Sequence, residues 1–238
     1  MSHVISPQFP MSEHDAISLL ENLDRENAYL VPKIPGAWGR VAVWRLTNNL
    51  VVKSRSSRPS HDIFTMGLVA SETTIPVPRV QQCLRWKNSW WLIMDYVEGV
   101  DLKDEWPSLT SDERKEVAET LSSYVQQLRN VKLSNPSIPG PIDGTGASLP
   151  CAISCCRDPL GPFDSCSKMS SWFSKRFNWF INRPHNTLFG KPSSTELGLS
   201  DCIDWDWNTL YLTHGDISLS NARRDKDGKI WLLDWVIF

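Results

Sequence analysis

The chain has 238 residues, of which 41% are hydrophobic and 22% are charged, a balance typical of a globular protein rather than a disordered one. Its formal net charge of -2 gives no reason to expect a nucleic acid or a membrane surface as a partner. No apolar run approaches the roughly 18 residues that a membrane span needs, and the start, MSHVISPQFPMSEHD, lacks the basic end and apolar core of a secretory signal.

The six cysteines show no regular framework spacing. Cys151, Cys155 and Cys156 form a C-x3-C-C cluster that could suggest zinc, but the cluster has no nearby histidine to complete a ligand set. We interpret the cysteines as reduced thiols of a cytosolic protein, and therefore expect a cytoplasmic location.

The first elements in chain order are a helix and a hairpin. Residues 12–27 begin with Ser12 and Asp15 in capping-box-like positions and continue with apolar residues at helical spacing. Alternating apolar residues on both sides of the turn at 47–49 then predict two antiparallel strands, with Lys53 at the end of the second.

A second helix and a second hairpin follow. Residues 60–73 have a helical pattern, which must end before Pro76 and Pro78 because proline holds the chain extended. Two further strands are predicted near 80–86 and 90–94, joined by a tight turn.

The remainder of the chain is richer in helices and loops. The clearest helix runs from 110 to 131 and carries a T-x-x-E cap at Thr110 and Glu113. Residues 134–162 are rich in Pro, Gly and Ser and predict a long loop, and helical patterning returns over 170–181. This order predicts an α+β fold with two lobes.

The last 30 residues contain the densest polar chemistry. Short apolar strands are predicted at 210–212 and 230–233, and if they pair, Asp216, Asn221 and Asp234 converge at one end of the hairpin. Two carboxylates and an amide oxygen are what a magnesium–nucleotide phosphotransfer site requires.

Two alternatives compete with that interpretation. Asp and Asn favour turns everywhere, although the combination H-G-D-x4-N followed by an apolar strand ending in Asp is more specific. His214 and Asp216 could also be a metal-hydrolase pair, but the other four histidines are scattered along the chain.

The segment LTHGDISLSN…IWLLDW resembles the catalytic and metal-binding motifs of the aminoglycoside phosphotransferase and choline kinase-like family. VVKS, TTIPVPRV and WLIMDYVEGVDL resemble its nucleotide-binding strand, its extended segment and its hinge, and GPFDSCSKMSSWF is similar to a stretch common in fungal members. The resemblance begins near residue 35. It implies a protein-kinase-like fold with a nucleotide-binding lobe over 1–95, in which 1–34 is a helical extension, and a mainly helical lobe over 96–238.

The resemblance also implies a role for each matching residue. Asp216 would be the base that accepts the acceptor's proton, and His214 would orient the catalytic loop. Asn221 and Asp234 would bind Mg2+, and Lys53 would hold the ATP phosphates, although without the other motifs a solvated lysine is the simpler interpretation. The hinge, whose backbone would bind adenine, comprises Met94, Asp95, Tyr96 and Val97.

Three departures from the family pattern follow. The glutamate that pairs with the nucleotide-binding lysine is replaced by the shorter Asp62, so that this ion pair is expected to be stretched or absent. The segment GAWGRV has only Gly36 and Gly39 to cover phosphates. Few residues follow Asp234, from which we expect a C-terminal lobe that is truncated.

Three functional hypotheses remain on sequence alone. The first is an ATP- and Mg2+-dependent phosphotransferase acting on a hydroxyl of a small-molecule acceptor. The second is a degenerate or truncated nucleotide-binding module without turnover, and the third, which leaves the three oxygen ligands unexplained, is an interaction-only protein. The acceptor cannot be identified; the acidic run at 201–207 could attract a cation, or could be a solvated loop.

Overall fold

The computed structural model describes residues 9–23, 29–31, 42–55, 58–133, 138–142, 161–181 and 209–235. The chain divides into two compact units. The first comprises Met1–Leu128 with Asp216–Trp235, and the second comprises Arg129–Gly215 with Val236–Phe238. The division into lobes at residue 95 stays a prediction.

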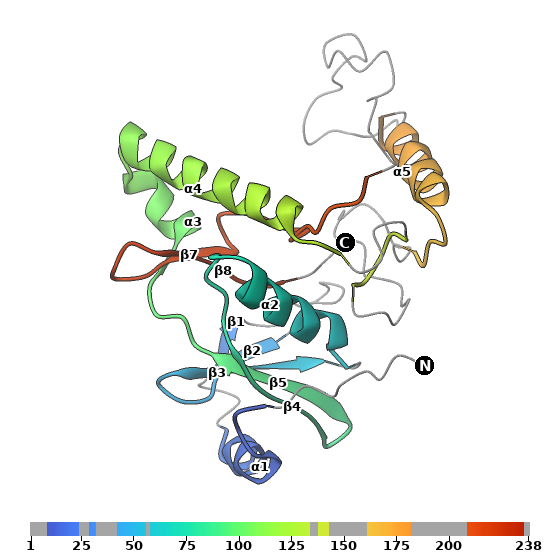
Figure 1. Ribbon diagram of the computed structural model, residues 1–238. Helices are drawn as coiled ribbons and strands as arrows, with labels where there is room; N and C mark the ends of the chain where they lie inside the picture. Colours follow the sequence, from blue (N-terminus) through green and yellow to red (C-terminus); the bar gives the residue numbers. More distant parts are fainter. Residues whose placement is uncertain are drawn as a thin grey trace. The chain divides into compact units, whose positions relative to one another are not determined.

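A five-stranded antiparallel sheet forms the centre of the first unit, with strand order β1-β2-β3-β5-β4 (Figure 1). Both predicted hairpins are confirmed, and the turn between the last two strands places Lys87 and Asn88 at positive φ, as a two-residue hairpin turn requires. The strands are β1 (Tyr29–Val31), β2 (Ala42–Arg45), β3 (Leu50–Arg55), β4 (Val80–Trp86) and β5 (Ser89–Asp95).

Helix α1 (Glu13–Glu21) covers one face of this sheet. It begins at Ser12, whose hydroxyl accepts a hydrogen bond from the Asp15 N–H, as the capping pattern predicted. Ala16 and Leu20 are buried, and each large apolar side chain buried in such a core contributes about 1.5–3 kcal/mol. The sheet residues in the same core are Trp44, Val52, Leu84, Trp91 and Ile93.

Helix α2 (Ser60–Glu72) lies on the opposite face (Figure 1). Side chains alternate between the two faces of a strand. Val52 lies on the face that α1 covers, so Lys53 and Arg55 lie on the opposite face, the one on the side of α2. The predicted extended segment follows at 73–79, and its Pro76 carbonyl accepts a hydrogen bond from the N–H of Leu232 (3.1 Å).

The terminal residues form a second, three-stranded sheet in the order β6-β7-β8, with bounds β6 (Val100–Asp101), β7 (Ala222–Arg224) and β8 (Ile230–Leu232). The predicted strand at 210–212 is wrong, because residues 209–214 form neither helix nor strand. Strand β8 instead pairs with β7 through a turn at Asp225, whose carboxylate accepts hydrogen bonds from two backbone N–H groups. This local partner takes the ladder position that the prediction assigned to 210–212.

Two short helical segments follow β6 and lead into a long helix. Helix α3 (Leu102–Glu105) and a 3-10 turn (Trp106–Ser108) precede α4 (Ser111–Asn130). The predicted capping box is confirmed: the Glu113 carboxylate accepts from the N–H of Thr110 (2.7 Å).

The second unit contains α5 (Cys166–Ile181), which begins before the predicted start near residue 170. Phe163 and Trp172 stack edge to face with ring centroids 6.2 Å apart. The cysteine cluster at 151–156, the acidic run at 201–207 and most of the predicted loop at 134–162 lie outside the described residues. Within the described ranges, no helix is long and apolar enough to cross a membrane.

Candidate active site

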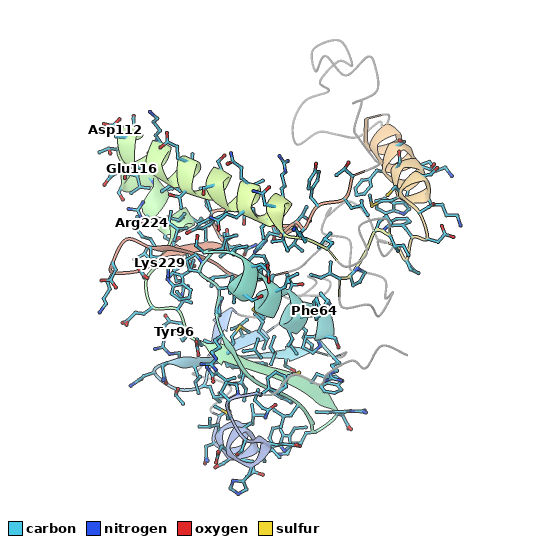
Figure 2. The ribbon with its side chains drawn as sticks, viewed as in Figure 1. Phe64, Tyr96, Asp112, Glu116, Arg224 and Lys229 are labelled. Carbon is cyan, nitrogen blue, oxygen red and sulfur yellow. The ribbon has the colours of Figure 1, made fainter. Side chains whose placement is uncertain are left out.

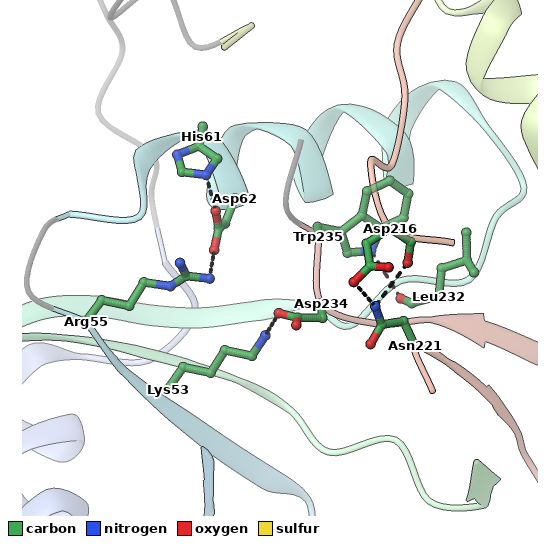
Figure 3. A network of polar contacts seen from close by, with 9 residues as sticks. All are labelled: Lys53, Arg55, His61, Asp62, Asp216, Asn221, Leu232, Asp234 and Trp235. Carbon is green, nitrogen blue, oxygen red and sulfur yellow. Dashed lines mark hydrogen bonds and ion pairs between the residues drawn. The ribbon is translucent and has the colours of Figure 1, made fainter. Parts of the chain in front are cut away.

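The loop from Asp216 to Asn221 is held by its own polar groups. Asn221 Nδ2 donates hydrogen bonds to Asp216 Oδ2 (2.8 Å) and to the Asp216 carbonyl (3.0 Å) (Figure 3). The N–H of Asn221 donates to the Ser218 carbonyl (3.0 Å), which closes a turn inside the loop. The Asn221 amide therefore orients the Asp216 carboxylate through Nδ2, and its Oδ1 can accept a hydrogen bond from a donor or bind a cation.

Asp234 follows directly after β8 and is tied to the same loop. The N–H of its neighbour Leu233 donates to the Asn221 carbonyl (2.8 Å), so the loop end and the strand end are adjacent. Asp234 has a φ of 57°, in the left-handed region that non-glycine residues adopt infrequently but Asp tolerates. The next residue, Trp235, is buried and donates to the Leu232 carbonyl (3.1 Å), which anchors the turn.

Lys53 reaches this site from the large sheet. Its Nζ lies 2.6 Å from Asp234 Oδ1, and 12% of the Lys53 side chain is exposed, against 46% of that of Asp234 (Figure 3). A nearly buried ammonium therefore faces a carboxylate that is open to solvent. Lys53, Asp216, Asn221 and Asp234, which span most of the chain, belong to one compact unit.

Asp62 does not pair with Lys53. Its carboxylate oxygens lie 2.6 Å from Arg55 Nη2 and 2.6 Å from His61 Nε2, and only 3% of the Asp62 side chain is exposed. The stretched or absent Lys53 pair expected from the shorter side chain therefore has a specific cause: a second cation two residues along β3 takes the carboxylate. Nearby, burial raises the pKa of Cys83 to about 11; the Arg58 charge opposes this increase, and the smaller effect of the Asp62 charge adds to it.

The predicted hinge, Met94–Val97, spans the end of β5. The backbone N–H groups of Asp95 and Tyr96 are both engaged, the latter with the Asn49 carbonyl (2.8 Å). The described part of the chain offers no acceptor to the N–H of Val97. Val97, a buried residue, therefore carries the hinge N–H that no described acceptor engages.

The phosphate-covering glycines and His214 stay predictions. Gly36 and Gly39, the candidate phosphate-covering glycines, lie outside the described residues. His214 is buried, with 1% of the residue exposed, and belongs to the second unit.

The side-chain oxygens of Asn221 and Asp234 are candidate ligands for a metal ion. Among the residues that the structure describes, no three His, Cys, Asp or Glu side chains group around one point. Magnesium, however, keeps several waters and is commonly held by one or two carboxylates together with substrate phosphates. A solvent-open Asp234 beside the Asn221 amide fits that mode of binding.

Two arginines in the surroundings were not predicted as functional. Arg55 shares a strand face with Lys53, and the two-residue spacing in VVKSR is the signal that could have shown it. Arg223 lies two residues after Asn221 on β7 and contacts the hinge. The motif resemblance did not include it, because such contacts depend on which strands lie together in space.

No protein-family model and no curated protein matches the chain. Solved structures do. A thermostable mutant of aminoglycoside phosphotransferase APH(4)-Ia, in ternary complex with AMP-PNP and hygromycin B, matches with a TM-score of 0.52 and 16% identity, over 94% of this chain and 71% of that one. A second structure of such a mutant, with ADP and hygromycin B, matches with a TM-score of 0.50 and 17% identity, over 87% and 65% of the two chains.

Aminoglycoside phosphotransferase APH(3'')-Id from Streptomyces rimosus matches with a TM-score of 0.51 and 15% identity, over 95% of this chain and 78% of that one. At these identities the likeness concerns the fold. It confirms the predicted α+β, protein-kinase-like fold, with an antiparallel sheet followed by a helical region.

Proposed function

We propose that the protein binds ATP with Mg2+ and transfers the γ-phosphoryl group to a hydroxyl of a small-molecule acceptor. The observation that carries the proposal is the meeting of Lys53, Asp216, Asn221 and Asp234 within one compact unit. The fold shared with aminoglycoside phosphotransferases, one of which was solved with AMP-PNP and with ADP, supports it.

Asn221 Oδ1 and the Asp234 carboxylate would hold the cation. Mg2+, when bound, neutralises negative charge on the phosphates. A cation at Asp234 would compete with the present Lys53–Asp234 contact, since the 2.6 Å ion pair engages the same carboxylate. The Lys53 ammonium would then be available to a phosphate, and its low exposure would strengthen that attraction.

Asp216 would act as the base. Its carboxylate is exposed at the start of the loop, and Asn221 Nδ2 holds one oxygen in place at 2.8 Å. A carboxylate orients an attacking hydroxyl and accepts its proton, and in phosphoryl transfer such positioning accounts for most of what the protein contributes.

The hinge would bind the adenine. The Val97 N–H is the donor that the described backbone does not use, and the neighbouring Asp95 and Tyr96 N–H groups are fixed by their own hydrogen bonds. A rigid strand end with one open donor is suited to a planar heterocycle.

The experiment compares wild-type protein with Asp216→Asn and with Ser220→Ala, a control at an exposed position of the same loop. Phosphate release from ATP and transfer to a panel including hygromycin B, choline and hexoses are measured with 32P-labelled ATP. We expect Asp216→Asn to lower transfer at least 100-fold, in the range of general base catalysis, with ATP affinity changed less than threefold. Equal rates in wild type and Asp216→Asn would contradict the role of Asp216.

A second candidate, nucleotide binding without turnover, is favoured by one observation. Asp62 is engaged by Arg55, so Lys53 has no acidic partner on α2. This candidate predicts wild-type ATP binding without phosphoryl transfer to water or to any compound in the panel. Measurement of ATP affinity together with phosphate release and transfer therefore separates the two functions.

A further inference from the structure

Arg223 joins the candidate hinge to the strand that follows the catalytic loop. It lies on β7, paired in register with Asp101 of β6. Its Nη1 donates to the Val97 carbonyl (2.9 Å), its Nε donates to Asp101 Oδ1 (2.7 Å), and its Nη2 lies 2.6 Å from the same oxygen. One guanidinium thus uses all three of its nitrogens on two neighbouring segments.

Two arginine side chains also contact the aromatic ring of the hinge residue Tyr96. The Arg223 guanidinium lies 5.6 Å from the centre of the Tyr96 ring, and that of Arg45 lies 3.3 Å from it. Both distances are within the range of a cation–π contact. The Tyr96 N–H is bound to Asn49, so Tyr96 is held through its backbone and its ring.

These contacts leave Val97 constrained on both sides. The preceding peptide is fixed through Tyr96, and the following peptide is fixed through the bond from Arg223 to the Val97 carbonyl. The direction of the Val97 N–H, which no described acceptor engages, is set by these two restraints.

We infer that Arg223 is a positioning residue for nucleobase recognition: it holds the Val97 hinge in the orientation that presents its N–H to a heterocycle. The inference rests on the proposed function. It assigns Arg223 no contact with the phosphates, which would be bound by Lys53 and the cation ligands. Arginine suits the task because its planar fork can serve a carbonyl and a carboxylate together, whereas a lysine reaches them as a single point charge.

The neighbouring Arg224 supplies a matched control. It lies on the same strand, 22% of its side chain is exposed against 20% for Arg223, and it pairs with Glu105 at 3.2 Å. Figure 2 labels Arg224 and Tyr96. Arg224→Met therefore removes a comparable arginine–carboxylate pair, but without a contact to Val97.

The test measures the dissociation constants of ATP and of inorganic tripolyphosphate, both with Mg2+, for wild type, Arg223→Met, Arg223→Lys and Arg224→Met. We expect Arg223→Met to weaken ATP about tenfold, as loss of a hydrogen bond to a charged group does, and tripolyphosphate less than twofold. Arg223→Lys should lie between wild type and Arg223→Met, and Arg224→Met should match wild type for both ligands. Thermal unfolding of each variant establishes that it is folded.

The outcomes separate the inference from the proposed function. If wild type binds ATP and if Arg223→Met and Arg224→Met weaken that binding equally, the inference is overturned but the proposed function is not. Equal weakening of ATP and tripolyphosphate by Arg223→Met would also overturn it, because a general loss of site structure affects both ligands. Absence of ATP binding by the folded wild type would overturn the proposed function, and the inference with it.

Discussion

Two ion pairs made by cationic side chains of β3 differ in how much they stabilise the fold. Lys53 and Arg55 follow the alternation of β3, and each contacts an acid: Lys53 contacts Asp234 and Arg55 contacts Asp62. The pairs have the same 2.6 Å separation but not the same surroundings, since Asp62 is buried and Asp234 is open to solvent. Burial decides which pair matters for stability, because a buried charge that loses its partner cannot recover its hydration.

We predict that Arg55→Met lowers the free energy of unfolding by up to about 3 kcal/mol, the lower end of the cost of breaking a buried pair, because the buried Asp62 carboxylate then keeps only its contact with His61. Lys53→Met, the matched control on the same strand, should cost less than about 1 kcal/mol, because the exposed Asp234 is rehydrated. Urea unfolding followed by tryptophan fluorescence measures both. A larger loss for Lys53→Met than for Arg55→Met would show that burial does not rank these pairs.

The sequence could predict which candidate residues lie close together, but not every partner that their side chains take. The spacing H-G-D-x4-N and an apolar strand ending in Asp234 indicated a site, and the structure brings Asp216 and Asn221 into contact. The partner of Asp62 could not be predicted, because two cations on one strand compete for it and their reach is a matter of three-dimensional geometry. The roles of these residues in binding and catalysis stay predictions.

At the scale of elements, the terminal hairpin of β7 and β8 is organised by one carboxylate. Asp225 Oδ1 accepts from the N–H groups of Asp227 and Lys229, and its Oδ2 accepts from Trp231 Nε1 (2.8 Å). The hydrogen bond from Trp231 contributes most to lowering the pKa of Asp225 below its ordinary value, and the two backbone bonds add to it. The hairpin that supports Asp234 thus depends on an ionised side chain in its turn.

The lowered pKa of Asp225 determines how the stability of the fold changes with pH. A carboxyl that is more acidic in the folded state stabilises the fold above its ordinary pKa of 3.8, and this contribution is lost as the pH falls below that value. We predict that the difference in Tm between wild type and Asp225→Asn is largest near pH 7 and shrinks as the pH falls from 5 to 3. Melting curves at pH 7, 5, 4 and 3 measure it, and a difference that grows toward acid would contradict the assignment.

Elements formed by contacts between neighbouring segments were predicted correctly, whereas the pairing of distant segments was not. The hairpins β2–β3 and β4–β5 are local and carry turn residues between alternating strands, so the pattern contains them. The three-stranded sheet does not follow from a local pattern, because β6 joins it across more than a hundred residues with only a two-residue ladder. The apolar run at 210–212 has the pattern of a short strand. Apolar residues can also be buried outside strands, however, and Leu212 is buried in a segment without regular structure.

At the scale of the whole molecule, the first compact unit contains every candidate site residue except His214. It combines a sheet covered by a helix on each face with the terminal hairpin and the loop from Asp216 to Asn221. The nucleotide is the ligand that the residues of this unit are proposed to bind. A ligand that binds only the folded state stabilises it by about 2.7 kcal/mol at 100 times its Kd.

The most direct test of the account is calorimetric titration of the protein with ATP, with Mg2+ and with EDTA, in wild type, Asp234→Asn and Asp227→Asn. Asparagine tolerates the left-handed backbone of position 234, and Asp227 is an exposed turn residue of the same hairpin, so its variant controls for the loss of one acid. We predict that Mg2+ tightens ATP binding at least tenfold in wild type and Asp227→Asn, and less than twofold in Asp234→Asn. ATP affinity that is the same with Mg2+ and EDTA in wild type, or equally Mg2+-dependent in Asp234→Asn, would contradict the proposed magnesium–nucleotide site.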